Sequence, residues 1–172
     1  MPETALLIID MLNDFVLEGA PLEVPSTREI IPAIKREIGA ARSEATPIIY
    51  VCDAHAPDDR EFLIWPRHSV KGTKGATIID DLRPEEDDII VEKTTYSSFY
   101  KTNLEEVLGR LAARELVITG CVTNICILYA ASDAVLRGYT VTVPRDCSAW
   151  LDVEDHNFAI RHMKNVLKVN VR

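Results

Sequence analysis

The sequence has little glycine and proline, and it lacks any apolar run long enough to cross a membrane. Seven glycines and nine prolines in 172 residues exclude a collagen-like or low-complexity chain. The N-terminus also lacks the basic, apolar and small-residue pattern of a signal peptide. We therefore expect a cytoplasmic protein without membrane contact, folded as a single domain over residues 1–172.

Basic side chains are scarce relative to acidic ones. The chain has 19 Lys and Arg against 27 Asp and Glu, which gives a net charge of −8 at pH 7. A surface that binds phosphate backbones needs a positive face, so we expect no nucleic-acid partner. The composition leaves open whether the chain forms a homo-oligomer.

Several motifs of well-known enzyme classes are absent. No G-x-G-x-x-G and no P-loop occurs, which argues against a nucleotide-binding module. No G-x-S-x-G elbow occurs, which argues against a serine hydrolase of the α/β-hydrolase type. The cysteines form no C-x-x-C pair and fit neither a zinc ribbon nor a disulfide framework, so we expect four free thiols: Cys52, Cys121, Cys126 and Cys147.

Short apolar runs alternate with segments of helical period along the whole chain. The runs are rich in β-branched residues and have strand length: Ala5–Asp10, Pro47–Asp53, Asp88–Lys93, Glu115–Gly120, Tyr139–Pro144 and Lys168–Val171. The helical segments are 26–43, with Ser26 and Glu29 as a capping box, then 103–114, 124–137 and 152–168. This alternation predicts an α/β fold, a six-stranded parallel sheet with helices on both faces.

Polar residues end three of the apolar runs. Asp10, Asp53 and Lys93 occupy these ends, and Cys126 follows the fourth run just inside the next helix. Ligands of open α/β sheets bind at the carboxyl ends of the strands, so we expect these four side chains to converge on one crevice. Taken singly, each charge is more simply a strand-end group that points to solvent.

Cys126 lies in a position that favours a nucleophile. The positive end of the helix dipole would lower the thiol pKa, and free backbone amides there can hold an oxyanion. Lys93 would stabilise the thiolate, and Asp10 could carry a proton to a leaving amine. The alternative is a buried cysteine that packs its helix on the sheet.

The long segment 54–87 follows the second run and has few clear elements. Asp53 and His55 point the same way from a strand end, and His68 could complete a Zn, Mn or Fe site with open positions. Glu61 lies between them and is a candidate fourth ligand. Surface histidines are the alternative interpretation. Two histidines of the last helix lack ligand spacing, and we expect them to be structural or exposed: His156 and His162.

Four motifs occur in a defined order. They are LLIID-ML-NDF from Leu6, D-A-H at Asp53 followed by W-P-R-H-S-V-K-G-T-K-G-A from Trp65, E-K-T-T-Y-S-S-F from Glu92, and I-T-G-C-V-T-N-I-C from Ile118. Together they resemble the isochorismatase-like cysteine hydrolases, and within these the nicotinamidases, from about Ala5 to Val171. The resemblance implies a strand order of 3-2-1-4-5-6.

The resemblance also implies a reaction and the residues that perform it. Asp10, Lys93 and Cys126 match the catalytic triad, and a thioester on Cys126 would form during the hydrolysis of nicotinamide to nicotinate and ammonia, a step of NAD salvage. The peptide between Val122 and Thr123 would be cis, and the amides of Val122 and Cys126 would form the oxyanion hole.

The substrate would lie between two aromatic side chains and a metal ion. Phe15 and Trp65 match residues that sandwich the substrate ring. A divalent metal, zinc by preference with Mn or Fe as alternatives, would be held by four side chains: Asp53, His55, His68 and Glu61.

Two departures from the nicotinamidase pattern keep other functions open. Met11 and Leu12 replace a glutamine-containing stretch, and Asn124 stands where nicotinamidases tend to have an acid. One alternative is another amidohydrolase of the superfamily that acts on a carbamoyl or ureido compound. The alternative of a different class is a non-catalytic α/β binding domain with the same fold.

Overall fold

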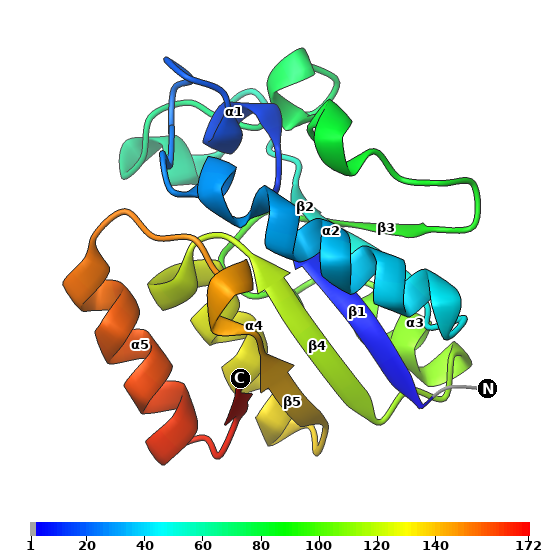
Figure 1. Cartoon of the computed structure of the whole chain (residues 1–172). Helices are drawn as coiled ribbons and strands as arrows, with labels where there is room; N and C mark the ends of the chain where they lie inside the picture. The colour runs from blue at the N-terminus through cyan, green and yellow to red at the C-terminus, as the bar shows by residue number, and fades with distance from the viewer. Residues whose placement is uncertain (1–2) are drawn as a thin grey trace.

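The computed structural model describes residues 3–172 and is built around one parallel sheet (Figure 1). The strands lie in the order β3-β2-β1-β4-β5-β6, and each adjacent pair is parallel. The strands are β1 (Thr4–Ile9), β2 (Ile48–Asp53), β3 (Ile89–Lys93), β4 (Glu115–Gly120), β5 (Thr140–Val143) and β6 (Asn170–Val171). The predicted α/β class and strand order are confirmed.

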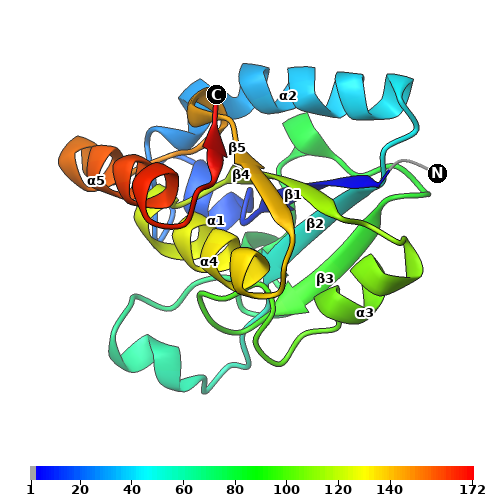
Figure 2. The ribbon, with the colours of Figure 1, turned by 90° about the horizontal axis from the view of Figure 1, so that it is seen from below.

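Helices cover both faces of this sheet (Figure 2). Side chains alternate along β1, so that Leu6 and Ile8 pack in the layer of α2 whereas Leu7 and Ile9 pack in the opposite layer. The helices are α1 (Asn13–Val16), α2 (Thr27–Ser43), α3 (Leu104–Arg110), α4 (Leu128–Leu136) and α5 (Val153–Asn165). Within residues 3–172, none of them is long and apolar enough to cross a membrane.

The predicted capping box at the start of α2 does not form. The Ser26 hydroxyl donates to the carbonyl of Trp150 at 2.5 Å and accepts the Trp150 N–H at 2.7 Å. Because this hydroxyl is engaged outside the helix, it makes no cap hydrogen bond with α2. Ser26 instead ties the start of α2 to the segment that leads into α5.

Two helices end earlier than the sequence period predicts. α3 ends at Arg110, and Ala112 has a φ of 53°, a left-handed conformation that a right-handed helix cannot include. α5 ends at Asn165, and the φ of 59° at Lys168 turns the chain before β6. The left-handed residue also explains why the last strand is shorter than predicted.

The segment between β4 and α4 differs most from the prediction. β4 ends at Gly120, whose φ of 116° suits glycine, and a Cβ there would lie 2.0 Å from the carbonyl oxygen of Ile9. The helix predicted from residue 124 is a π-helical turn, η4 (Thr123–Ile127), which continues into α4. The cis peptide joins Cys121 and Val122, one residue earlier than the resemblance implies.

The long connection between β2 and β3 lies at the carboxyl ends of the strands (Figure 1). It contains three short 3₁₀ turns: η1 (Arg60–Leu63), η2 (Lys74–Ala76) and η3 (Asp80–Leu82). His55 and Val70 pair in an isolated bridge, so the connection folds back beside the end of β2. This arrangement brings residues of the connection next to the ends of β1 and β2.

Candidate active site

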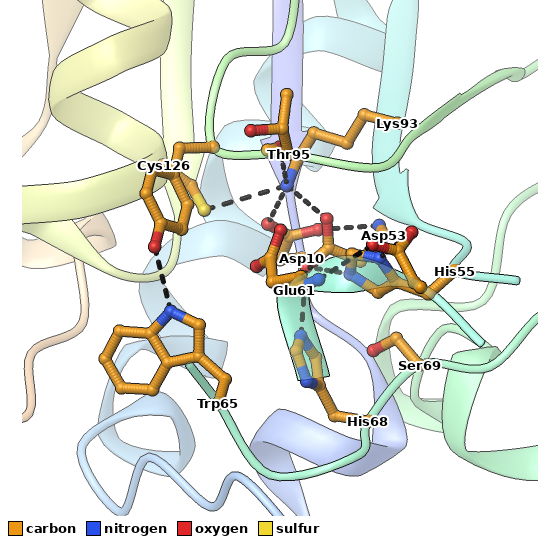
Figure 3. A network of polar contacts seen from close by, with 12 residues as sticks. Asp10, Asp53, His55, Glu61, Trp65, His68, Ser69, Lys93, Thr95 and Cys126 are labelled. Carbon is orange, nitrogen blue, oxygen red and sulfur yellow. Dashed lines mark hydrogen bonds and ion pairs between the residues drawn. The ribbon is translucent and has the colours of Figure 1, made fainter. Parts of the chain in front are cut away.

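The ammonium of Lys93 is the centre of a buried cluster of polar side chains (Figure 3). Its Nζ lies 2.8 Å from Asp10 Oδ2, 2.5 Å from Asp53 Oδ1 and 3.6 Å from the Sγ of Cys126. Lys93 ends β3, Asp53 ends β2 and Asp10 follows β1, so adjacent parallel strands deliver the three charges to one edge. The structure therefore brings together the strand-end residues that the sequence singled out.

The two carboxylates of this cluster have opposite pKa shifts. Burial and the neighbouring Asp53 carboxylate raise the pKa of Asp10 to about 6, although Lys93 opposes the shift. Burial also disfavours the charge on Asp53, but the Lys93 ammonium and the imidazoles of His55 and His68 outweigh it and lower the pKa of Asp53. Asp10 is thus the carboxylate suited to take up a proton near neutral pH.

The expected low pKa of the Cys126 thiol is not what the structure indicates. Burial raises the pKa of Cys126 well above its ordinary value, and the nearby Lys93 ammonium only opposes that effect. Cys126 is the fourth residue of η4, the turn with which the helix begins, so its place in the first turn is as predicted, but burial determines the direction of its pKa shift. The resting group is therefore a thiol, which needs a proton acceptor in order to act as a nucleophile.

Two imidazoles share the second oxygen of Asp53. The Nε2 atoms of His55 and His68 lie 3.6 Å and 3.7 Å from Asp53 Oδ2. Their Nδ1 atoms lie 3.1 Å from Asp59 Oδ2 and 2.7 Å from the carbonyl oxygen of Pro66. Acceptors at both Nδ1 positions hold a proton there, so both Nε2 atoms face Asp53: they direct N–H groups toward the carboxylate while the imidazoles are protonated, and they offer lone pairs to a metal ion when the imidazoles are neutral.

This arrangement fits a divalent metal ion. The ligand atoms of Asp53, His55 and His68 lie within 4.8 Å of one another, and all three residues are buried. His55 Nε2 is buried without a hydrogen-bond partner among residues 3–172, as expected of an atom that would coordinate an ion. One carboxylate and two imidazoles with oriented Nδ1 atoms are a donor set for zinc or another first-row metal.

Glu61 lies outside this group of three. It lines the same cavity as Asp53 and His68, and burial together with the Asp53 carboxylate raises its pKa. Its function as a fourth ligand stays a prediction.

A cavity opens beside the cluster and has aromatic walls. Phe15 is buried, and its ring centroid lies 5.4 Å from that of His68. Trp65 lines the same cavity from the connection between β2 and β3. The Trp65 indole donates to the hydroxyl of Tyr96 at 2.9 Å, which fixes the orientation of the indole (Figure 3). Among residues 3–172, the cavity lining includes three carboxylates and no arginine or lysine.

The backbone beside Cys126 offers a hydrogen-bond donor to this cavity. Val122 lines the cavity, and its amide has no acceptor among residues 3–172. The carbonyl of Val122 accepts from Ile125 at 3.1 Å and from Ile127 at 3.2 Å, so the turn that carries Cys126 is folded around this residue. Asn124 points away, toward Asp155 of α5, at 3.4 Å.

Three residues of the site were missed by the sequence analysis. Tyr96 holds Trp65, Asp59 holds His55, and the ring of Phe62 lies 5.4 Å and 5.8 Å from the two metal-site imidazoles. The sequence could have predicted that Tyr96 belongs to the site, because it is an aromatic residue three positions after the strand-end residue Lys93. Asp59 caps the 3₁₀ turn η1 and Phe62 lies within it, in a connection whose contacts no periodicity predicts.

Comparison with known proteins assigns the chain to a family. Residues 4–170 match the Isochorismatase domain family. The chain belongs to the isochorismatase family of hydrolases. It is 38% identical, over 95% of its own length and 89% of the relative, to an Arabidopsis thaliana protein described as a probable inactive nicotinamidase.

Solved structures of this family match both the fold and its length. An N-carbamoylsarcosine amidase from Thermoplasma acidophilum is 34% identical with a TM-score of 0.89, and the match covers 98% of this chain and 95% of that one. A pyrazinamidase from Pyrococcus horikoshii in complex with zinc is 30% identical with a TM-score of 0.93, and 99% of each chain is covered. These isochorismatase-family relatives differ in substrate, so the family alone leaves the substrate open.

Proposed function

We propose that this isochorismatase-family hydrolase is a metal-dependent cysteine amidohydrolase that converts nicotinamide to nicotinate and ammonia. The observation that carries the proposal is the contact of the Cys126 thiol and the Asp10 carboxylate, which both line an aromatic cavity, with one buried ammonium behind them, Lys93 Nζ. Phe15 and Trp65 supply walls for a flat ring. These walls support a small aromatic amide as the substrate.

The reaction would begin with a proton transfer inside the cluster. Asp10 accepts the thiol proton of Cys126, and the sulfur attacks the carboxamide carbon. The amides of Val122 and Cys126 donate to the oxyanion. Asp10 then protonates the amine, which leaves as ammonia, and the acyl group remains on Cys126 as a thioester.

Hydrolysis of the thioester returns the enzyme to its starting state. Asp10, now a carboxylate, accepts a proton from a water that attacks the thioester carbon. The carbon–sulfur bond breaks, nicotinate leaves, and the proton returns to Cys126. Lys93 stays charged throughout and offsets one of the two negative charges on Asp10 and Asp53.

The second task of the site is to hold the ring. Bound to Asp53, His55 and His68, with Glu61 as the proposed fourth ligand, a divalent ion would supply a Lewis-acidic position for the pyridine nitrogen. Zinc is the proposed ion, because the similar pyrazinamidase from Pyrococcus horikoshii was solved with zinc.

A carbamoyl or ureido substrate is the second candidate. It is favoured by the 34% identity to an N-carbamoylsarcosine amidase and by Asn124 in place of an acid. Substrates of this kind that carry a carboxylate need a cationic partner, and the cavity lining includes Asp10, Asp53 and Glu61 but no arginine or lysine within residues 3–172. This lining favours an uncharged amide.

Ammonia release from a panel of amides tests the proposal. The zinc-loaded protein would be assayed with nicotinamide, pyrazinamide, benzamide and N-carbamoylsarcosine, with Cys126→Ala as the control for contaminating amidases. We expect nicotinamide and pyrazinamide to be hydrolysed and benzamide, which lacks the ring nitrogen, to be poor. A preference for N-carbamoylsarcosine would leave the cysteine mechanism intact but overturn the substrate, and no release from any amide would favour a binding domain.

A further inference from the structure

His156 is a buried histidine that lies outside the cavity and has no part in the proposed reaction. It belongs to α5, and 3% of its surface is exposed. Its Nδ1 lies 2.9 Å from the hydroxyl oxygen of Thr123, the first residue of η4. The sequence pattern leaves open whether this residue is structural or exposed, and the structure places it against the turn that carries Cys126.

The hydrogen bonds around Thr123 define the direction of this contact. The Thr123 hydroxyl donates to the carbonyl of Ala149 at 2.6 Å, so it can only accept from His156. His156 must therefore carry its proton on Nδ1. The ring of Trp150, whose centroid lies 4.8 Å from that of the imidazole, packs against it and limits its rotation.

Backbone hydrogen bonds with Ala149 hold the chain on both sides of Val122. The Thr123 N–H donates to the carbonyl of Ala149 at 2.8 Å, and the Ala149 N–H donates to the carbonyl of Gly120 at 2.9 Å. Val122 lies between these two attachment points, with its amide free to face the cavity. A shift of Thr123 would therefore move Val122, and the π-helical turn that hydrogen-bonds to the Val122 carbonyl would move with it.

We propose that His156 is a positioning residue, which acts through Thr123 to keep the Val122 amide and the Cys126 sulfur aimed at the same substrate carbonyl. The inference rests on the proposed function, because it assumes that Val122 donates to an oxyanion. A histidine that only fills space between α5 and η4 would contribute to folding and would leave the chemistry unchanged. The two roles differ in what a substitution does to the transition state.

Substitutions at both ends of the contact separate these roles. His156→Asn keeps an N–H near the position of Nδ1, His156→Leu removes it, and Thr123→Val removes the hydroxyl without changing the shape of the side chain. His162→Leu is the matched control on the same helix, because the imidazole of His162 packs on Phe158 and not on η4.

We expect His156→Leu and Thr123→Val to lower kcat for nicotinamide by about 10- to 100-fold, because displacement of an oxyanion donor weakens transition-state binding. KM should change by less than about threefold, since the Phe15 and Trp65 walls are untouched. His156→Asn should recover most of kcat, and His162→Leu should behave as the wild type. A fall in unfolding temperature with unchanged kcat in both variants would overturn the inference.

A second measurement does not depend on turnover. Pyridine-3-carbaldehyde can add reversibly to the Cys126 sulfur: the sulfur–carbon bond forms, the S–H bond and the carbonyl π bond break, and the thiol proton passes through Asp10 to the new oxygen. The product is a hemithioacetal whose oxygen occupies the position of the oxyanion. Its affinity can be read from the protection of Cys126 against iodoacetamide. We expect His156→Leu and Thr123→Val to weaken this affinity at least tenfold, and His156→Asn to restore it.

The two measurements distinguish the possible failures. If the wild type hydrolyses no amide, the proposed function fails, and protection by the aldehyde still tests His156. If the wild type binds no aldehyde, or all variants bind it equally, the positioning inference fails whatever the amide panel shows. If His156→Leu does not fold, Thr123→Val compared with Thr123→Ser, which keeps the hydroxyl, gives the same test.

Discussion

At the scale of single residues, the buried cluster holds more negative charge than positive. Lys93 supplies one ammonium against the carboxylates of Asp10 and Asp53, so the ionised cluster already carries one net negative charge. Release of the Cys126 proton to solvent would add a second negative charge in a buried site. Transfer of that proton to Asp10 keeps the total charge constant, which explains why a raised thiol pKa and a raised Asp10 pKa suit one reaction.

Removal of the thiol should therefore abolish turnover without loss of the fold. We expect Cys126→Ala to release no ammonia above background, while its unfolding free energy changes by no more than about 1 kcal/mol. Cys147→Ala is the control: Cys147 is fully buried away from the cavity, so the same change should cost about 1 kcal/mol and leave kcat intact.

Alkylation offers an independent check of the same residue. Cys126 lines the cavity, whereas Cys52 and Cys147 do not, so mass mapping after iodoacetamide treatment should find Cys126 modified before either of them. Faster modification of Cys147 than of Cys126 in the folded protein would contradict the assignment of the nucleophile.

Asn124 should affect stability and not substrate choice. Its amide donates to the Asp155 carboxylate, so Asn124→Asp places two carboxylates against each other and loses a hydrogen bond. We expect a loss of about 1 kcal/mol in urea unfolding and an unchanged order of amides in the panel. Asn124→Ala removes the hydrogen bond without adding charge, so its unfolding free energy should fall by less than that of Asn124→Asp. A changed order of substrates would show that this position determines specificity.

At the scale of elements, the end of β4 leaves almost no room for a side chain. Gly120 pairs with Ile9, the last residue of β1, and the cluster residue Asp10 follows directly. Asp10 itself has a φ of 53°, a conformation that costs free energy for a residue with a side chain. The close approach of β1 and β4 thus sets both the place of the carboxylate and the start of the turn that carries Cys126.

Gly120→Ala should consequently disturb both at once. The left-handed φ and the contact with the Ile9 carbonyl predict a destabilisation of about 2 kcal/mol or more in urea unfolding. The matched control is Gly39→Ala in α2, where a Cβ meets nothing within 4 Å and the change should be neutral or stabilising. If the two variants had the same unfolding free energy, the ends of β1 and β4 would be able to move apart to accept the added Cβ, and the prediction would be wrong.

The sequence was most informative where an apolar run ends in a polar residue. Asp10, Asp53 and Lys93 were found in this way, because alternation of strands and helices predicts a parallel sheet whose carboxyl ends share an edge. The metal-site residues of the connection were predicted from the shared direction of Asp53 and His55 at a strand end, from the position of His68 in the long loop, and from the resemblance. Each of these inferences uses a regularity that is local in the sequence.

Other features depend on contacts between distant segments. The π-helical turn at Cys126 has the same apolar pattern as an α-helix, and its register is decided by the Val122 carbonyl and by α5. The hydroxyl of Ser26 was predicted to cap its own helix but bonds to Trp150. The sequence predicts a lowered pKa for Cys126, but burial, which no local motif reveals, raises it.

At the scale of the whole molecule, the three candidate metal ligands Asp53, His55 and His68 come from separate segments of the chain. Asp53 ends β2 and His55 follows two residues later, whereas His68 lies further along the connection between β2 and β3. Asp53 also contacts Lys93 of β3. An ion bound by these residues would therefore hold the connection against the sheet in the folded state, and the unfolded chain would lose that site.

Removal of the metal should lower thermal stability as well as activity. A ligand present at 100 times its Kd stabilises the folded state by about 2.7 kcal/mol, which corresponds to a Tm shift of about 5–10 °C for a chain of this size. Calorimetry before and after chelation, followed by addition of zinc, measures this shift. His68→Ala should show a Tm that is insensitive to zinc, and an equal zinc response in that variant would contradict the ligand assignment.

The hydrogen bond between Trp65 and Tyr96 gives the protein an optical signal. The chain has two tryptophans, and Trp65 is the one at the cavity wall. In a Trp150→Phe background, all indole fluorescence would come from a ring held at a fixed angle beside the ligand. Combined with Cys126→Ala, which cannot turn over, such a protein would report the affinity of each intact amide directly, separating how well a substrate binds from how fast it reacts.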